Sequence, residues 1–387
     1  MLESISLLEP LMPISNRELV DLATELIETA QRLNHSVHPV LRTELGKLVR
    51  SMNCYYSNLI EGHKTLPIDI ERALNNNFVD DERVKNLQLE AIAHIKVQEK
   101  IDLDLGVEKA MTQARIRWIH REFSSHLPMA MLEVANQEQT KVVQITPGEY
   151  RTGKVIVGKH IPISAAAIAP FLTRFEQGYN RDKLSKIDAV IAAAASHHRL
   201  LWIHPFYDGN GRVSRLFSHG YLREIGIGNS LWSVARGLAR NQEEYKKHLA
   251  LADSSRWNDL DRRGNLTNKG LVEFCCFFLG VCLDQIKFMT SLIEPDLILN
   301  RIEIYTEEQI RLGNLLPHSF LLLKQLWLEG EVSKSRVPQI VGYQERQART
   351  LQKKLIEAGL ISADSKRSPF RLSFPMAIAE RYFPALF

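Results

Sequence analysis

The chain has 387 residues, of which 45% are hydrophobic and 24% are charged, and its formal net charge is +4. This composition is ordinary for a globular protein and argues against a disordered or fibrous chain. No apolar run approaches the ~18 residues that would span a membrane, Met1–Ser4 lacks a basic signal-peptide start, and the four cysteines show no metal-ligand spacing. We therefore expect a cytoplasmic protein with no membrane partner.

Helical patterns occupy most of the sequence, which predicts a mainly α fold. The length is sufficient for two or three domains with their own cores. We expect a helical N-terminal region over residues 1–105 and a central core over 108–255. A helical extension over 256–310 and a C-terminal domain of different pattern over 316–374 follow.

The first informative element is a helix predicted over Leu45–Ile60, a stretch without Gly or Pro. Gly62 is a natural C-terminal cap for it. Glu61 then falls in the final turn, where the helix dipole disfavours an anion by up to ~1 kcal/mol. A carboxylate in that position suggests a cationic partner elsewhere. Ser57 lies four residues before Glu61 and therefore on the same face.

Further along, Val155-Ile156-Val157 stands between turn signals within residues 147–162 and predicts a short β-hairpin. Taken alone, such a hairpin is usually an ordinary surface feature.

The alanine-rich stretch over 191–203 predicts a buried helix. Pro205 disfavours helical geometry at the residue before it, so His204 should sit where the helix gives way to a loop. Gly209 and Gly211 allow positive φ and close approach of a ligand. A second helix is predicted over Val213–Leu222, with its positive dipole end facing the same loop.

The side chains between residues 204 and 215 suit the binding of a metal-bound polyphosphate. Asp208 offers a hard oxygen ligand for Mg²⁺. Arg212 and Arg215, three residues apart, can each bind phosphate oxygens as a fork. His204 has the ordinary pKa, near ~6.5, of a base that works at neutral pH. A glycine-rich stretch is usually only a turn, and it is the coincidence of these groups that indicates a site.

The segment His204–Arg215 resembles the Fic-domain signature His-x-Phe-x-(Asp/Glu)-Gly-Asn-Gly-Arg-x-x-Arg at every specified position. The resemblance implies an enzyme that transfers AMP from ATP to a Ser, Thr or Tyr hydroxyl of a target protein or of itself. It implies His204 as the general base and Asp208 as the Mg²⁺ ligand. It assigns the α- and β-phosphates to Gly209, Asn210 and Gly211, and the β/γ end to Arg212 and Arg215. Because the glycines are kept, nucleotidyl transfer is favoured over the kinase activity of the family's Lys-containing branch.

Two flanking stretches extend the resemblance. Residues 148–158 resemble the Fic flap, which registers the target segment by strand addition, and Val157 and Gly158 would also line the nucleotide pocket. Residues 241–249 resemble the helix that borders the adenine. Tyr245 would stack on the base, although a helical Tyr is as often a packing residue, and Asp253 would face the ribose or the adenine edge.

Ser57–Gly62 resembles the Fic inhibitory motif (Ser/Thr)-x-x-x-Glu-(Gly/Asn). The resemblance implies that Glu61 pairs with Arg215, denies it to the γ-phosphate and so holds ATP in an unproductive pose. In some family members the same glutamate aligns a water that removes AMP, so a de-AMPylating activity stays open.

The C-terminal pattern predicts a helix over Phe320–Leu328 and then a helix-turn-helix, whose first helix falls within residues 332–340 and whose second covers Gln344–Glu357 and is ended by Gly359. Two short strands are predicted around residues 364–369. This is the order of a winged helix. Between Ser333 and Arg371 nine Lys or Arg stand against three Asp or Glu, which suits contact with DNA phosphates. Winged helices also serve as protein-docking or homodimer modules. The alternative to the enzyme is therefore a DNA-binding regulator that uses its Fic core as a nucleotide sensor.

Overall fold

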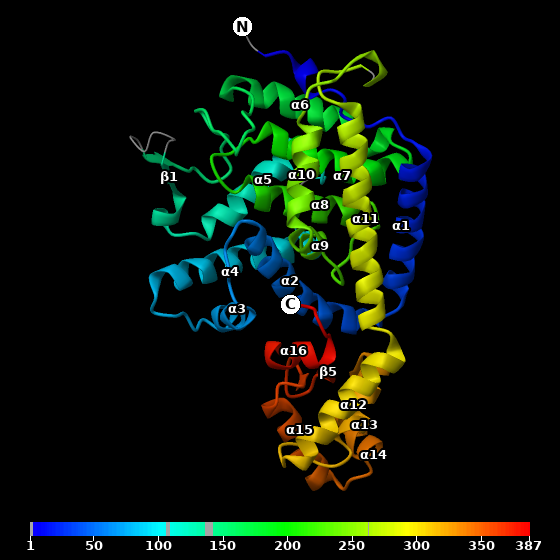
Figure 1. Ribbon diagram of the computed structural model, residues 1–387. Helices are drawn as coiled ribbons and strands as arrows, with labels where there is room; N and C mark the ends of the chain where they lie inside the picture. Colours follow the sequence, from blue (N-terminus) through cyan, green and yellow to red (C-terminus); the bar gives the residue numbers. More distant parts are fainter. Residues whose placement is uncertain (1–2, 106–108, 136–141, 262) are drawn as a thin grey trace. The chain divides into compact units, whose positions relative to one another are not determined.

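The computed structural model describes residues 3–105, 109–135, 142–261 and 263–387, and it is mainly α-helical, as predicted (Figure 1). In the part described, no helix is both long and apolar enough to cross a membrane. The helices are α1 (Arg17–His35), α2 (Pro39–Ile60), α3 (Pro67–Leu74), α4 (Glu82–Asp102), α5 (Gln113–Ser125), α6 (Ile168–Gly178), α7 (Lys186–Ile203), α8 (Asn210–Glu224), α9 (Val234–Arg240), α10 (Gln242–Ala252), α11 (Asn268–Leu292), α12 (Pro295–Arg311), α13 (Ser319–Glu329), α14 (Val337–Val341), α15 (Glu345–Glu357) and α16 (Met376–Tyr382). The short strands are β1 (Glu133–Ala135), β2 (Val142–Gln144), β3 (Glu331–Val332), β4 (Ile361–Ser362) and β5 (Phe370–Leu372).

The chain forms two compact units. Unit 1 consists of Met1–Gln31, Asn53–Asn229 and Ser233–Gln285, and unit 2 of Arg32–Met52, Ser230–Trp232 and Ile286–Phe387. These units cut across the four segments expected from the sequence, because α1, α2 and α11 each contribute residues to both. All residues predicted for the catalytic and inhibitory sites belong to unit 1.

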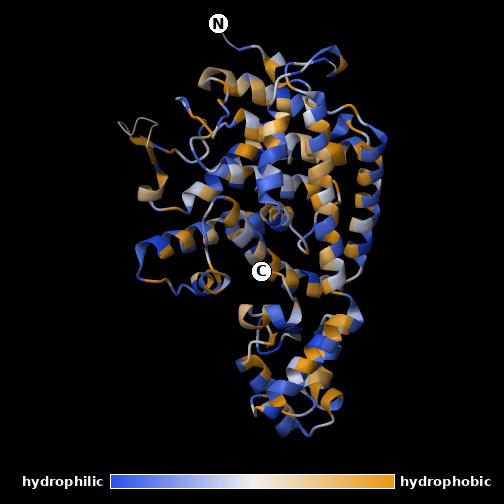
Figure 2. Ribbon diagram, in the orientation of Figure 1, coloured by the Kyte–Doolittle hydropathy of each residue, from blue (hydrophilic) through white to orange (hydrophobic). Residues whose placement is uncertain are grey.

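The core of unit 1 is built around α7, which pairs closely with α8. Every residue from Ala189 to Leu200 is buried, and the four alanines Ala192–Ala195 are fully so. Short side chains at the contact let the axes of two helices approach. Helices α4 and α5 also pack on α8. Figure 2 shows the resulting contrast between mostly hydrophobic helices such as α11 and the mixed, more hydrophilic α1. The segment His204–Arg215 thus begins at the end of one buried helix, crosses the connecting loop and continues into a second buried helix.

Two helix starts differ from the sequence expectation. Helix α2 begins at Pro39 rather than Leu45, with proline at a first-turn position that tolerates its missing N–H. Helix α8 begins at Asn210 rather than Val213. Gly209 adopts φ +78° and allows the chain to turn directly into the helix.

The hairpin predicted within residues 147–162 is reduced to one antiparallel bridge between Val157 and His160, across a turn in which Gly158 has φ +60°. Unit 1 instead contains an antiparallel pair of strands, β1 and β2, in which Glu133 lies opposite Gln144. Three-residue strands are too short to show the alternation on which a sequence prediction relies. The sequence analysis therefore missed this pair.

Unit 2 contains α13, the α14–α15 pair joined across Gly342 (φ +67°), and a small antiparallel sheet in the order β3-β5-β4. Strand β5 sits between the others, with Val332 opposite Phe370 and Ile361 opposite Leu372. Helices α13 and α15 and strands β4 and β5 lie where the sequence predicts them, and α14 overlaps the helix predicted within residues 332–340. Strand β3 is additional.

Candidate active site

His204 stands at the C-terminal end of α7 in the left-handed conformation, with φ 50° and ψ 63°. Its N–H donates to the Leu200 carbonyl at 3.1 Å, and its carbonyl accepts from Arg151 Nε at 2.8 Å. The Arg151 N–H in turn donates to the Pro205 carbonyl at 2.9 Å. Burial lowers the pKa of the His204 imidazole to about 4. The ring is therefore neutral at physiological pH and can accept a proton.

The loop after His204 is held by buried partners. Phe206 stacks on His120 with ring centroids 3.9 Å apart. The Asn210 carboxamide accepts from the Phe206 N–H at 3.0 Å and donates to the Phe206 carbonyl at 2.9 Å. The Asn210 side chain therefore fixes the shape of the loop, and its backbone N–H stands at the start of α8.

The start of α8 forms an anion site. The first N–H groups of a helix have no intrahelical acceptor and carry the positive end of its dipole. The Glu61 carboxylate lies over this helix start, because a Cβ added at Gly211 would overlap its Oε1 atom. Glycine at position 211 thus leaves room for an anionic group, and in this structure the group is Glu61.

Arg215 is buried and bound by the end of α2. Its Nε donates to Ser57 Oγ at 2.9 Å, and its Nη2 donates to the Ser57 carbonyl at 3.1 Å and to Glu61 Oε1 at 2.5 Å. Burial works against ionisation of Glu61, but the charge and hydrogen bond of Arg215 outweigh it and lower the pKa of that carboxyl. Gly62, with φ +86°, ends the helix as the sequence predicts. Arg215 is therefore in direct contact with Ser57 and Glu61, which lie 158 and 154 positions before it in the sequence.

Arg212 has a different set of partners. Its Nη1 donates to Glu90 Oε1 at 2.5 Å and its Nη2 to Asp208 Oδ2 at 3.0 Å. Its guanidinium also lies over the Phe123 ring, 4.9 Å from the centroid. Glu90 Oε2 accepts from His63 Nδ1 at 2.8 Å. The sequence analysis singled out neither Glu90 nor His63, since nothing in the local pattern of α4 marks one glutamate among its charged residues.

Asp208 fits the role expected for a magnesium ligand. Its side chain is 55% exposed although one oxygen receives Arg212. Mg²⁺ is usually held in enzymes by one or two carboxylates together with substrate phosphates and water. A single carboxylate beside a phosphate site meets that requirement, and no group of three or more potential ligand side chains occurs among the residues that the structure describes.

The residues expected around the adenine and ribose have distinct positions. Val157 is 42% exposed, on the same turn as Gly158. Asp253 receives His198 Nε2 at 3.1 Å and lies 3.9 Å from His160 Nδ1, which places it close to this turn. Tyr245 is 3% exposed, and its hydroxyl lies 2.7 Å from His197 Nε2. Tyr245 therefore packs in the interior.

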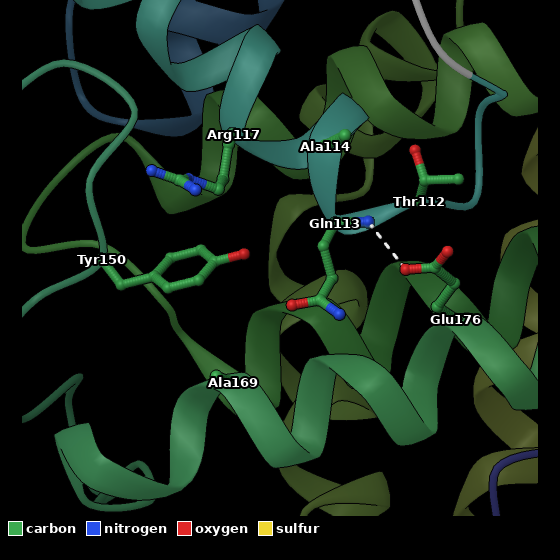
Figure 3. A pocket seen from close by; sticks show the side chains of 7 residues that line it. All are labelled: Thr112, Gln113, Ala114, Arg117, Tyr150, Ala169 and Glu176. Atoms are coloured by element: carbon green, nitrogen blue, oxygen red, sulfur yellow. Dashed lines mark hydrogen bonds between the residues drawn. The ribbon is translucent and has the colours of Figure 1, made fainter.

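A separate pocket of about 500 Å³ opens between α5 and α6. Figure 3 shows Tyr150 and Arg117 reaching into it, opposite the hydrogen bond from the Gln113 N–H to Glu176. Burial raises the pKa of Tyr150 to about 12, so its hydroxyl stays protonated. None of the residues predicted for the site lines this pocket.

Buried neutral histidines make the stability of the protein sensitive to acid. Burial lowers the pKa to about 3 for His94 and His197 and to about 4 for His120 and His204. The unfolded chain binds these protons near pH 6.5, so stability is lost as pH falls below that value. Between pH 6.5 and 5 we expect a loss of about 2 kcal/mol for each group.

Melting temperatures at pH 7.5, 6.0 and 5.0 measure this loss. His94→Leu should reduce the dependence, whereas replacement of the exposed His35 by Asn should leave it unchanged. An unchanged melting temperature down to pH 5 would contradict the assignment of neutral buried histidines.

Comparison with known proteins agrees with this geometry. Residues 110–222 match the model of the Fic/DOC family. Two relatives named protein adenylyltransferase Fic are each 40% identical, over 96 residues in Drosophila erecta and over 125 residues in Drosophila melanogaster. These stretches cover 25% and 32% of this chain, and only 19% and 24% of the relatives. The chain thus contains a Fic domain and spans about a quarter or less of the curated relatives it matches.

Solved structures show that the similarity of fold extends beyond the domain. A Fic family protein from Desulfovibrio desulfuricans G20 covers 94% of this chain and 98% of its own, with a TM-score of 0.55 and 18% identity. Fic-1 (aa134–508) from C. elegans covers 71% of this chain and 72% of its own, with a TM-score of 0.53 and 18% identity. At such identity these structures speak for the fold alone.

Proposed function

We propose that this protein is a protein adenylyltransferase, which transfers AMP from ATP to a Ser, Thr or Tyr hydroxyl of a target protein and of itself. The observation that carries the proposal is the α7–loop–α8 geometry. A neutral imidazole, a half-exposed carboxylate and the N-terminus of a helix stand within twelve residues. The curated relatives named adenylyltransferases support the same reaction class.

In the proposed reaction His204 takes the proton of the attacking hydroxyl. The hydroxyl oxygen then forms a bond to the α-phosphorus of ATP while the bond from that phosphorus to the bridging oxygen breaks, and pyrophosphate leaves. The N–H groups of Gly209, Asn210 and Gly211 would face the developing charge, where preorganised dipoles are most effective. When bound at Asp208, Mg²⁺ would neutralise phosphate charge. Arg215 would bind the terminal phosphate.

The same proposal makes Glu61 inhibitory. Its carboxylate occupies the helix start over Gly211 and takes a hydrogen bond from Arg215. An anionic side chain and a triphosphate cannot use this position together. Productive ATP binding therefore requires displacement of Glu61 from Arg215.

Differential labelling tests the reaction class. Purified protein is incubated with Mg²⁺ and with ATP that carries the label on either the α- or the γ-phosphate. We expect transfer of α-label to protein and none of the γ-label. Transfer of γ-label would indicate a kinase, and transfer of neither by wild type and by Glu61→Gly would overturn the proposal.

A second function, DNA binding by unit 2, is favoured by one group of observations. Helix α13, strand β3, the α14–α15 helix-turn-helix and strands β4 and β5 occur in the chain order of a winged helix. Exposed Arg346, Arg349 and Lys353 follow one face of α15. Lys334 donates to the carbonyls of Ser365 and Lys366 at 2.8 and 3.0 Å, which fixes the turn between β4 and β5.

Binding of the full-length chain to a fluorescent 30-base-pair duplex between 50 and 200 mM salt tests this function. If three phosphates are contacted, log K should fall with log salt with a slope of about −3. Arg346→Ala with Arg349→Ala should reduce the slope by about 2, whereas the exposed Lys324→Ala on α13 should not. If the chain shows no salt-sensitive binding to the duplex, the proposal that unit 2 binds DNA is wrong.

A further inference from the structure

The inhibitory carboxylate is carried by a short cap rather than by a helix. Helix α2 ends at Ile60, and the N–H groups of Glu61 and His63 both donate to the Asn58 carbonyl, at 3.1 and 2.9 Å. With Gly62 in the left-handed region, residues 61–63 fold back over the helix end. We call residues 61–63 the cap. Where Glu61 lies therefore depends on what holds the cap.

One carboxylate ties the cap to the catalytic helix. Glu90, on α4, receives His63 Nδ1 on one oxygen at 2.8 Å and Arg212 Nη1 on the other at 2.5 Å. Both Glu90 and Arg212 are buried, with 7% and 5% of their side chains exposed. A buried charge is held firmly only where it is paired and hydrogen-bonded. The Glu90 carboxylate is bound on one oxygen by His63 and on the other by Arg212, so it is both hydrogen-bonded and paired with a cation.

The charges around the cap reinforce this arrangement. The hydrogen bond that His63 donates to Glu90 raises the pKa of His63 against the effect of burial, and the charge of His63 in turn helps to lower the pKa of Glu61. The second attachment of this region is the hydrogen bond from Gln242 Nε2 to the Ile60 carbonyl, at 2.9 Å. Without Glu90, that backbone contact and the Glu61–Arg215 pair itself would hold the cap.

We propose that Glu90 is a positioning residue of the inhibited state: through His63 it holds the cap so that Glu61 stays on Arg215. This inference rests on the proposed function and names a second point of its regulation. A competing explanation is that Glu90 serves only to orient Arg212 for phosphate. The two differ in one respect, because positioning of Glu61 has no effect once Glu61 is absent.

A double-mutant cycle separates these explanations. Glu90→Gln keeps the shape of the side chain and removes its charge. Loss of a hydrogen bond to a charged group changes an equilibrium constant by about tenfold. We expect Glu90→Gln and His63→Gln each to raise transfer of α-label about tenfold in wild type and less than twofold in Glu61→Gly. The control is Glu122→Gln. It breaks an ion pair with Lys100, which lies on α4 as Glu90 does, and it should leave the transfer of label unchanged both in wild type and in Glu61→Gly. A tenfold loss in the Glu61→Gly background, or no activation in wild type by either variant, would overturn the proposal.

Amide hydrogen exchange measures how firmly the cap is held, and it does so without AMP transfer. The amides of residues 61–63 should exchange several-fold faster in His63→Gln, which leaves the Glu90–Arg212 pair intact, and in Glu90→Gln. Unchanged exchange in both variants would overturn the proposal even if the protein transfers no AMP. If Glu61→Gly transfers no label, the proposed function fails, and exchange alone decides the role of Glu90.

Discussion

Replacement of Glu61 by glycine is expected to raise auto-AMPylation by ten- to a hundredfold. The carboxylate binds Arg215 and covers the helix start at Gly211, and in the proposed function the terminal phosphate of ATP needs the same arginine. Loss of one partner of a fully buried pair is worth ~3 kcal/mol, or about a hundredfold. The Glu61 side chain is 33% exposed, so solvent screening reduces the effect towards the lower figure.

Initial rates with α-labelled ATP measure the change. Glu61→Gln, which keeps the hydrogen-bonding shape without the charge, should lie between wild type and Glu61→Gly. Release of AMP from protein that has already been labelled should be followed in the same variants, since the resemblance leaves a de-AMPylating role of Glu61 open. Equal rates for wild type and Glu61→Gly would mean that the contact with Arg215 does not limit transfer.

Replacement of His204 by alanine should reduce transfer by about 10²- to 10⁴-fold, the usual contribution of a positioned general base. The effect is best measured in the Glu61→Gly background, where the starting rate is high. Because no atom of the Gly209–Gly211 turn is altered, binding of ATP should change by less than about threefold. Transfer that survives in Glu61→Gly with His204→Ala would require a different base.

The sequence predicted the local parts of this site well. Pro205 indicated that His204 would end a helix, and Gly62 indicated where α2 would stop. Both are short-range consequences of backbone chemistry. The alanine run of α7 similarly indicated a buried helix, since a stretch of small apolar side chains has no polar face.

Long-range partners could not be predicted in the same way. Glu90 and Arg212 are separated by 122 positions, and no periodic pattern relates one to the other. No local pattern indicated that the Asn210 carboxamide would bind the backbone of Phe206, four residues away. The expected hairpin at Val157 became a single bridge because its strands have too few residues to form a ladder.

The backbone at His204 has a consequence for the evolution of this site. A residue with a Cβ at φ 50° and ψ 63° is disfavoured by roughly 1–2 kcal/mol relative to glycine. Folding alone would therefore prefer glycine at this position, and an imidazole there makes the protein less stable than it otherwise would be. If His204 is the base proposed above, selection for stability and selection for activity act in opposite directions on the same residue.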